Sequence, residues 1–267
     1  MSQRESKQTI QDFGAQWTRF TDNSGYYGSS ELFEDIVAPL MDASDVRGAN
    51  VADIGSGTGR IVDMLLRAGA ARVAAIEPSE AMEVLRGRFA DSEGRVIYHQ
   101  VTGEHVDELG PFDLVVSIGV LHHIPEPAPV VAAAYSSLHP GGRFFAWLYA
   151  REGNGLYLAL VLPLRAITKR LPDRILDGVV RLLDLPLVGY IALCRSLPLP
   201  MQDYMRNVVG RMAPDKRRLI IFDQLNPGYS KYYSRAEAEA LFAAAGFSNI
   251  QLYQRHGYSW SVIGTKA

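Results

Sequence analysis

The sequence has few of the features that mark secreted, membrane-spanning or nucleic-acid-binding proteins. It contains one cysteine, Cys194, so no intrachain disulfide can form and a cytoplasmic location is expected. Residues 1–7 are polar and lack the apolar run of a signal peptide. No uncharged apolar stretch approaches the roughly 18 residues that span a bilayer. We therefore expect no membrane span, although peripheral membrane contact stays open.

Charge of one sign, internal repeats and low-complexity tracts are also missing. The chain has 27 Lys and Arg against 29 Asp and Glu, a formal net charge of −2. This balance argues against a dedicated nucleic-acid partner. With 267 residues, 48% of them hydrophobic, the chain is long and apolar enough for one large α/β domain with an insertion.

One glycine-rich stretch carries the clearest chemical signal. Residues 51–60, Val-Ala-Asp-Ile-Gly-Ser-Gly-Thr-Gly-Arg, predict a buried strand, a tight turn and the start of a helix. A dinucleotide fingerprint would need a glycine where Arg60 stands, and a phosphate loop would need Gly-Lys-Ser/Thr. The acid before the turn, Asp53, would repel a pyrophosphate but suits a cationic ligand, such as the amino group of S-adenosylmethionine (SAM).

This stretch resembles motif I of the class I SAM-dependent methyltransferases, and the resemblance extends over about residues 45–150. It implies an α/β fold with a Rossmann-like, mostly parallel seven-stranded sheet and an antiparallel last strand. It also implies SAM as cofactor, with S-adenosylhomocysteine as the product. The motif I residues expected at the cofactor are Asp53, Gly55, Ser56, Gly57 and Gly59.

The ends of the following strands supply further candidates. Residues 72–77 form a nearly continuous apolar run, typical of a buried parallel strand. The run ends at Glu77, about 20 residues past the glycines, where an acid can accept the ribose hydroxyls. We also expect the next residue, Pro78, at the cofactor. A plain acid in the first turn of a helix is the alternative for Glu77.

The resemblance places two more chain segments at SAM. Glu104 stands where the family usually has an aspartate that accepts the adenine amino group, and the next backbone N–H, that of His105, would meet the ring. The alternative is a solvated loop acid. Ser117 ends the fourth expected strand, and Ile118 opens a loop that would lie beside the methionine part of SAM.

That loop continues as Val-Leu-His-His-Ile-Pro, a frequent family signature whose end faces the methyl acceptor. A hydroxyl acceptor needs a base, and histidine has a suitable pKa, so His123 and His122 are the catalytic candidates. Both histidines could equally serve by bonding the loop backbone. No cysteine or acid cluster accompanies them, so no metal is expected.

Aromatic residues mark the expected pocket. Residues 1–45 predict a helical lid segment with a break, in which Trp17 and Tyr27 either contact the bound cofactor or simply pack on the core. The residues expected to shape the acceptor pocket are Tyr27, Tyr149, Tyr229 and Tyr233.

The remaining chain divides at its leucine-rich part. Residues 46–150 would form the SAM-binding core, and 223–267 would complete its sheet. Residues 151–222, rich in leucine and interrupted by prolines, predict a helical insertion after the fifth strand. This insertion could be an acceptor-binding cap, a dimer surface or a face that rests on a membrane.

The sequence thus predicts SAM-dependent methyl transfer to a small molecule, a natural product or a glycan, on oxygen or nitrogen, by in-line displacement. A lipid-like acceptor ranks second, and a protein or nucleic acid last. A SAM-binding subunit without activity remains a separate class of function. The presence of both Asp53 and Glu77 favours an enzyme over a subunit without activity.

Overall fold

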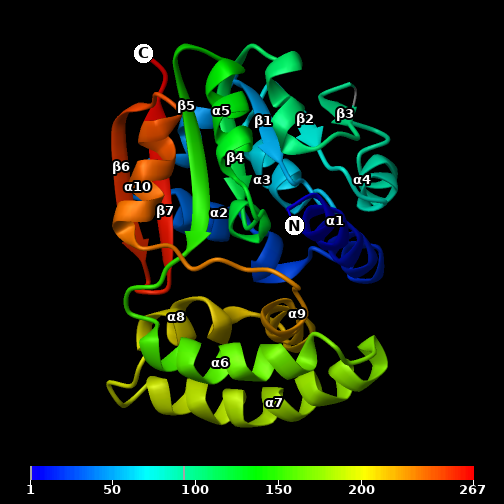
Figure 1. The fold of residues 1–267 in the computed structure, drawn as a ribbon, viewed down its shortest axis with the longest axis vertical. Coiled ribbons are helices and arrows are strands. Elements are labelled where there is room, and N and C mark those ends of the chain that lie inside the picture. The colour runs from blue at the N-terminus through cyan, green and yellow to red at the C-terminus, as the bar shows by residue number, and fades with distance from the viewer. Residues whose placement is uncertain (1, 93) are drawn as a thin grey trace.

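The apolar runs of the first half of the chain become parallel strands that alternate with helices. The structure is a computed structural model that describes residues 2–92 and 94–267. Its strands form one sheet in the order β3-β2-β1-β4-β5-β7-β6 (Figure 1). The first five are β1 (Asn50–Ile54), β2 (Arg72–Ile76), β3 (Val96–His99), β4 (Phe112–Ile118) and β5 (Leu138–Tyr149).

The last two strands close the sheet as predicted. β6 (Ser248–Arg255) and β7 (Ser259–Thr265) form a hairpin, and β7 runs antiparallel to both β5 and β6. The helix before them, α10 (Arg235–Ala244), begins with a capping box in which Ser234 and Glu237 bond each other's backbone N–H groups. The predicted seven-stranded, mostly parallel fold is confirmed.

Helices cover both faces of the sheet because alternate strand residues point to opposite sides. Val51 packs with one core cluster and its neighbour Ala52 with the other. The first cluster contains residues of α2 (Ser30–Val37), α3 (Arg60–Ala68) and α4 (Ala81–Arg88). The second contains residues of α5 (Ala128–Ser136) and α10.

The N-terminal segment is helical with a break, as expected. α1 (Ser2–Arg19) precedes the break, and α2 follows it with Ser29 as its N-cap. α2 ends at Val37, because a residue before a proline disfavours the helical conformation and Pro39 follows Ala38.

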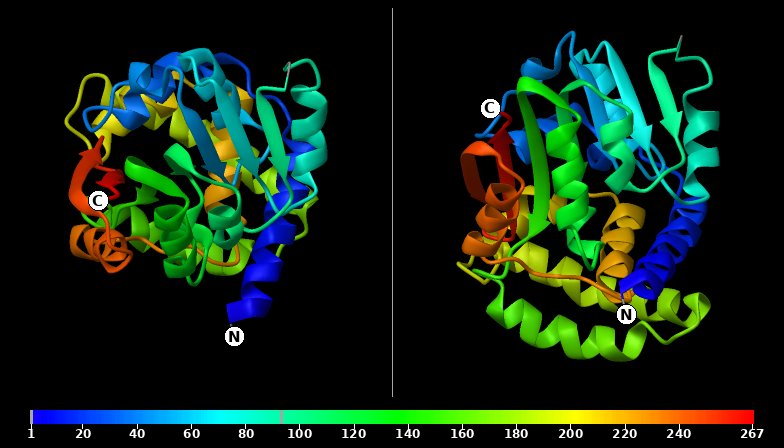
Figure 2. Two further views of the ribbon diagram at one scale, coloured as in Figure 1. Left: turned by 90° about the horizontal axis from the view of Figure 1, so that it is seen from above. Right: turned by 45° about the horizontal axis from the view of Figure 1, so that its top comes forward.

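The insertion lies at the carboxyl ends of the parallel strands, and the turned view shows the same arrangement (Figures 1 and 2). It consists of α6 (Gly155–Thr168), α7 (Asp173–Cys194), α8 (Gln202–Asn207) and α9 (Pro214–Leu225). The predicted boundary at residue 222 falls inside α9. This helix therefore continues from the insertion into the segment that was expected to complete the core. None of the helices in the described ranges is long and apolar enough to cross a membrane.

Candidate active site

A cavity of about 830 Å³ lies where the glycine turn, the two-histidine loop, α1 and the insertion meet. Parallel strands bring their carboxyl ends to one edge of the sheet, and ligands of such folds bind there. The predicted site residues that line the cavity are Trp17, Tyr27, Gly55, Ser56, Gly57, Glu77, Pro78, Glu104, Ile118, His123 and Tyr149.

The glycines of the turn do two different jobs. Gly55, Gly57 and Gly59 all have positive φ, which favours glycine. A Cβ on Gly57 would stand 3.5 Å from the indole of Trp17, so the lid helix packs closely over this glycine at the cavity wall. A Cβ on Gly59 would lie 2.4 Å from the ring of Phe89. Gly59 therefore lets the start of α3 pack against Phe89 at the end of α4. Gly59 does not line the cavity.

Asp53 is buried directly before the turn and is not part of the cavity wall. Its Oδ2 atom has no hydrogen-bond partner among the described residues. Burial raises the pKa of this carboxyl to about 7. The Ser56 hydroxyl holds the turn in place by donating to the Asp53 carbonyl at 2.9 Å and accepting from the Ile76 N–H at 3.1 Å.

Glu77 is fixed by three hydrogen bonds at the end of β2. Its Oε2 accepts the Gly57 N–H at 2.9 Å. Its Oε1 accepts the N–H and the hydroxyl of Ser79, at 2.9 Å and 2.5 Å. The carboxylate is thus oriented in the wall beside the glycine turn, with Pro78 next to it.

The expected adenine segment is only partly at the cavity. Glu104 lines it and stays half exposed. His105 does not: its side chain faces solvent beside Glu108, and its backbone N–H donates to the Thr102 carbonyl at 3.1 Å. The expected role of the His105 N–H is therefore wrong, because the loop closes into a short 3₁₀ helix, η3 (Gly103–Glu108), that uses this donor.

At the end of β4 only one of the two expected residues reaches the cavity. Ile118 is in the wall, whereas Ser117 is fully buried and its hydroxyl donates to the Ile54 carbonyl at 3.4 Å. Ser117 thus joins β4 to β1 behind the site.

The two histidines have different environments. The Nδ1 atom of His123 lies 3.1 Å from the Tyr229 carbonyl and 3.0 Å from the Ser230 hydroxyl. A carbonyl only accepts, so Nδ1 carries the proton and Nε2 is the unprotonated nitrogen. Burial lowers the pKa of His123, which keeps the ring neutral and able to accept a proton.

His122 does not line the cavity. It is fully buried, outside the cavity wall, and its ring lies 3.8 Å from that of Tyr149. The structure therefore separates the two candidates and presents only His123 to a ligand. No group of three His, Cys, Asp or Glu side chains in residues 2–92 and 94–267 could hold a metal ion.

Two of the expected acceptor residues lie in the wall. The Tyr149 hydroxyl donates to Asp223 Oδ2 at 3.2 Å and accepts from Gln224 Nε2 at 2.6 Å, and burial raises its pKa well above the usual value. Tyr27 is buried, with the Arg60 guanidinium 4.4 Å from its ring centre. Burial raises the pKa of Tyr27 as well, so both phenols stay protonated.

The other two tyrosines do not line the cavity. Tyr229 contributes its carbonyl to His123, as described above. Tyr233 packs in the core on the opposite face of the sheet, and Trp260 donates to its carbonyl. Its expected place in the acceptor pocket is wrong because side chains alternate in extended backbone. The neighbouring Tyr232 stacks on Tyr149 instead, with ring centres 5.3 Å apart.

The cavity also has aromatic wall residues outside the predicted set. Tyr204 on α8 and Tyr258 before β7 stack with ring centres 4.2 Å apart. Trp147 lies two residues before Tyr149, on the same face of β5, and its indole N–H is buried without a partner among the described residues. The strand period could have identified Trp147. No sequence signal places Tyr204 there.

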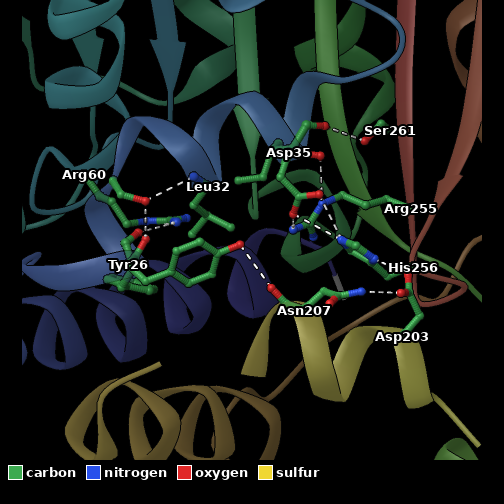
Figure 3. Close-up of polar contacts among 12 residues, drawn as sticks. Tyr26, Leu32, Asp35, Arg60, Asp203, Asn207, Arg255, His256 and Ser261 are labelled. Atoms are coloured by element: carbon green, nitrogen blue, oxygen red, sulfur yellow. Dashed lines mark hydrogen bonds and ion pairs between the residues drawn. The ribbon is translucent and has the colours of Figure 1, made fainter. Parts of the chain in front are cut away.

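Arg255 is a charged wall residue outside the predicted set. Arg255, at the end of β6, is 3% exposed and lines the cavity. Its guanidinium donates to the side chain and the carbonyl of Asp35 on α2 (Figure 3). Arg255 thus connects the last hairpin to the N-terminal segment.

Comparisons with known proteins agree with this geometry. Residues 52–144 match the family model of a methyltransferase domain. The ubiquinone biosynthesis O-methyltransferase of Aromatoleum aromaticum is 37% identical over 128 residues, which cover 47% of this chain and 54% of that protein. The chain thus spans about half the length of the curated relatives it matches.

Solved structures share the fold. An O-methyltransferase family protein from Burkholderia thailandensis superposes with a TM-score of 0.56 at 14% identity, covering 89% of this chain and 56% of that one. Human N-acetylserotonin methyltransferase in complex with SAM gives 0.52 at 16% identity, covering 89% and 53%. Together with the strand order and the glycine turn, the family match shows that residues 52–144 are similar to a methyltransferase domain.

Proposed function

We propose that this protein transfers the methyl group of SAM to a hydroxyl of a small ring compound. The observation that carries the proposal is one continuous cavity with the glycine turn and Glu77 in one part and His123 among aromatic walls in another. A methyl donor and an acceptor must meet in such a space with water excluded.

The residues at the first part fit SAM. Asp53 is buried next to the glycine turn, outside the cavity wall, and a cationic amino group that reached its unpartnered Oδ2 would supply the missing donor. Gly57 and Trp17 lie together in the wall, and Glu77 offers lone pairs to ribose hydroxyls. Bound there, SAM supplies an electrophilic methyl carbon on a sulfonium that leaves as a neutral thioether.

The second part suits a hydroxylated ring. Trp147, Tyr204 and Tyr258 provide flat apolar walls, and the free indole N–H of Trp147 can donate to an acceptor oxygen. His123 Nε2 would take the hydroxyl proton as the oxygen attacks, and Nδ1 stays bonded to the Tyr229 carbonyl throughout. The relatives named as O-methyltransferases support oxygen over nitrogen as the acceptor atom.

Replacement of His123 tests the proposal. Methyl transfer from SAM to a panel of phenols and glycosides would be measured for the wild type and His123→Gln. We expect turnover to fall by about 10²–10⁴-fold, the usual worth of a general base, with SAM affinity by calorimetry nearly unchanged. The acidic limb of the pH–rate profile should disappear with the base.

The matched control is His105→Gln, a histidine that faces solvent outside the cavity. Equal turnover in the wild type and His123→Gln would remove His123 as the base. Tight SAM binding without turnover on any acceptor, together with a stable complex with another protein, would favour the non-catalytic subunit.

A further inference from the structure

Helices α6 and α7 expose an apolar surface that the described chain leaves uncovered. On α6, Leu160 and Ile167 are 67% and 64% exposed; on α7, Leu182 and Leu185 are 68% and 69% exposed. Their helical spacing puts each pair on one side of its helix. With the exposed Leu156, these residues define what we call the α6–α7 surface.

This surface points away from the rest of the protein. The opposite sides of both helices pack on α9: Arg165 of α6 donates to the Gln224 carbonyl at 2.6 Å, and Val180 of α7 is buried with Phe222. α6 and α7 form the outermost layer at this end of the molecule in both the front and the tilted views (Figures 1 and 2). The exposed leucines therefore lie on the outer sides of α6 and α7, and the inner sides of these helices are packed.

The acids of α7 are neutralised from inside the molecule. Asp173 and Asp177 form ion pairs with Arg19 of α1. Asp184 is buried and paired with Arg217 and Arg218 of α9. No carboxylate of α7 is left to balance a cation at the outer surface.

The cations around the α6–α7 surface, in contrast, are free. All are exposed, and none forms an ion pair within the part of the chain that the structure describes. They are Lys169, Arg170, Arg174, Arg181 and Arg195. Arg174 and Arg181 stand two turns apart on α7, each directly before an exposed apolar residue, Ile175 and Leu182. The surface thus combines apolar side chains with unbalanced positive charge.

We propose that the α6–α7 surface docks on a membrane that contains anionic phospholipids. The leucines would enter the boundary between headgroups and acyl chains while the cations contact lipid phosphates. A second copy of the chain is the less favourable occupant, because a symmetric interface would place free cations against free cations. The proposal rests on these surface residues and is independent of methyl transfer.

Vesicle flotation of the full chain tests it. We expect binding to vesicles of phosphatidylglycerol and phosphatidylcholine in equal parts, little binding to phosphatidylcholine alone, and weaker binding as salt screens the charges. Replacing Leu182→Glu and Leu185→Glu together should reduce binding at least about tenfold, because both apolar contacts are lost and charge is added. Both side chains are mostly exposed, and circular dichroism would verify that the variant is folded.

Two further variants make the test specific. Ile97→Glu is the matched control, since Ile97 is an exposed apolar residue on β3, outside the insertion, and its replacement should leave binding unchanged. Arg174→Gln with Arg181→Gln should weaken binding by about fivefold for each cation removed. Absence of vesicle binding, equal binding to both vesicles, or a dimer in sedimentation that Leu182→Glu and Leu185→Glu dissociate without any lipid effect would each overturn the proposal.

Discussion

At the scale of single residues, Asp53 is a buried carboxyl next to the glycine turn. It is 1% exposed, and burial raises its pKa from 3.8 to about 7. Between these two pH values the folded protein holds a proton that the unfolded chain has released. Stability therefore falls as pH rises through this window. A bound cation would reverse the penalty by pairing with the ionised carboxylate.

Asp53→Asn separates ligand binding from stability. Asparagine carries no charge, so the free energy of unfolding above about pH 7 should increase by up to about 4 kcal/mol, the equivalent of the pKa change. SAM affinity should fall at least about tenfold, because the amino group loses an ionic partner. Urea unfolding at about pH 5 and pH 8, with calorimetric titration of SAM, measures both effects.

The solvent-exposed Asp91 provides the control, since Asp91→Asn should change neither quantity. If Asp53→Asn bound SAM as tightly as the wild type, the assignment of Asp53 to the amino group would be wrong.

At the scale of elements, the β6–β7 hairpin joins three parts of the chain. His256 and Gly257 at its tip both have positive φ, as in tight hairpin turns. The His256 ring lies between Asp35 of α2 and Asp203 of α8 (Figure 3). Burial lowers the pKa of His256, but the hydrogen bonds to both carboxylates outweigh burial and raise it above its usual value.

His256→Asn tests this junction, because asparagine tolerates positive φ but cannot carry the charge. The charged His256 ring stabilises the fold through its bonds to Asp35 and Asp203. This stabilisation is fully present below about pH 6.5 and is lost as pH rises through the raised pKa of His256. We expect the variant to lose about 1–2 kcal/mol of stability in acid and progressively less in alkaline solution. Denaturation midpoints across pH measure the difference, with His105→Asn as control. A loss independent of pH would mean that packing, not charge, holds the junction.

At the scale of the whole molecule, α1 closes the cavity by contacting several distant segments. Phe13 lies 4.7 Å from the His123 ring, Gln16 donates to Asp223 at 3.1 Å, and Trp17 covers Gly57. Arg19 then pairs with α7. The helix thus joins the glycine turn, the histidine loop and the insertion, and Figure 2 shows it beside α9.

Trp17→Ala should therefore weaken SAM binding by about 10- to 100-fold, since removal of a large aromatic wall costs about 1.5–3 kcal/mol of buried apolar surface. Trp17→Phe should retain most of the affinity. Hydrogen exchange should show α1 amides protected by added SAM in the wild type. Unchanged affinity in Trp17→Ala, with α1 exchange indifferent to SAM, would make this helix a structural element only.

Much of the core was predictable because its signals are local. A continuous apolar run identifies a strand buried on both faces, and glycines with positive φ identify the turn. Glu77 follows from its distance along the chain, and Ser234 with Glu237 from the capping pattern. These features depend on backbone conformation and burial, which neighbouring residues specify.

The other half of the site depends on contacts between distant segments, which spacing does not encode. Tyr204 and Tyr258 meet only because α8 packs beside the last hairpin. Tyr233 lies in the core while its neighbour Tyr232 stacks on Tyr149, because one residue of register decides which face of an extended chain each one takes.

By itself the sequence determined the α/β class, the glycine turn and the acids around it, because each rests on a pattern of neighbouring residues. Only the tertiary structure decided that His123 rather than His122 faces the cavity, since one loop turn points adjacent rings in different directions. It alone showed that α7 has two apolar sides, one buried against α9 and one exposed. Burial is a property of what packs on a residue, and the packing partner here is distant in the chain.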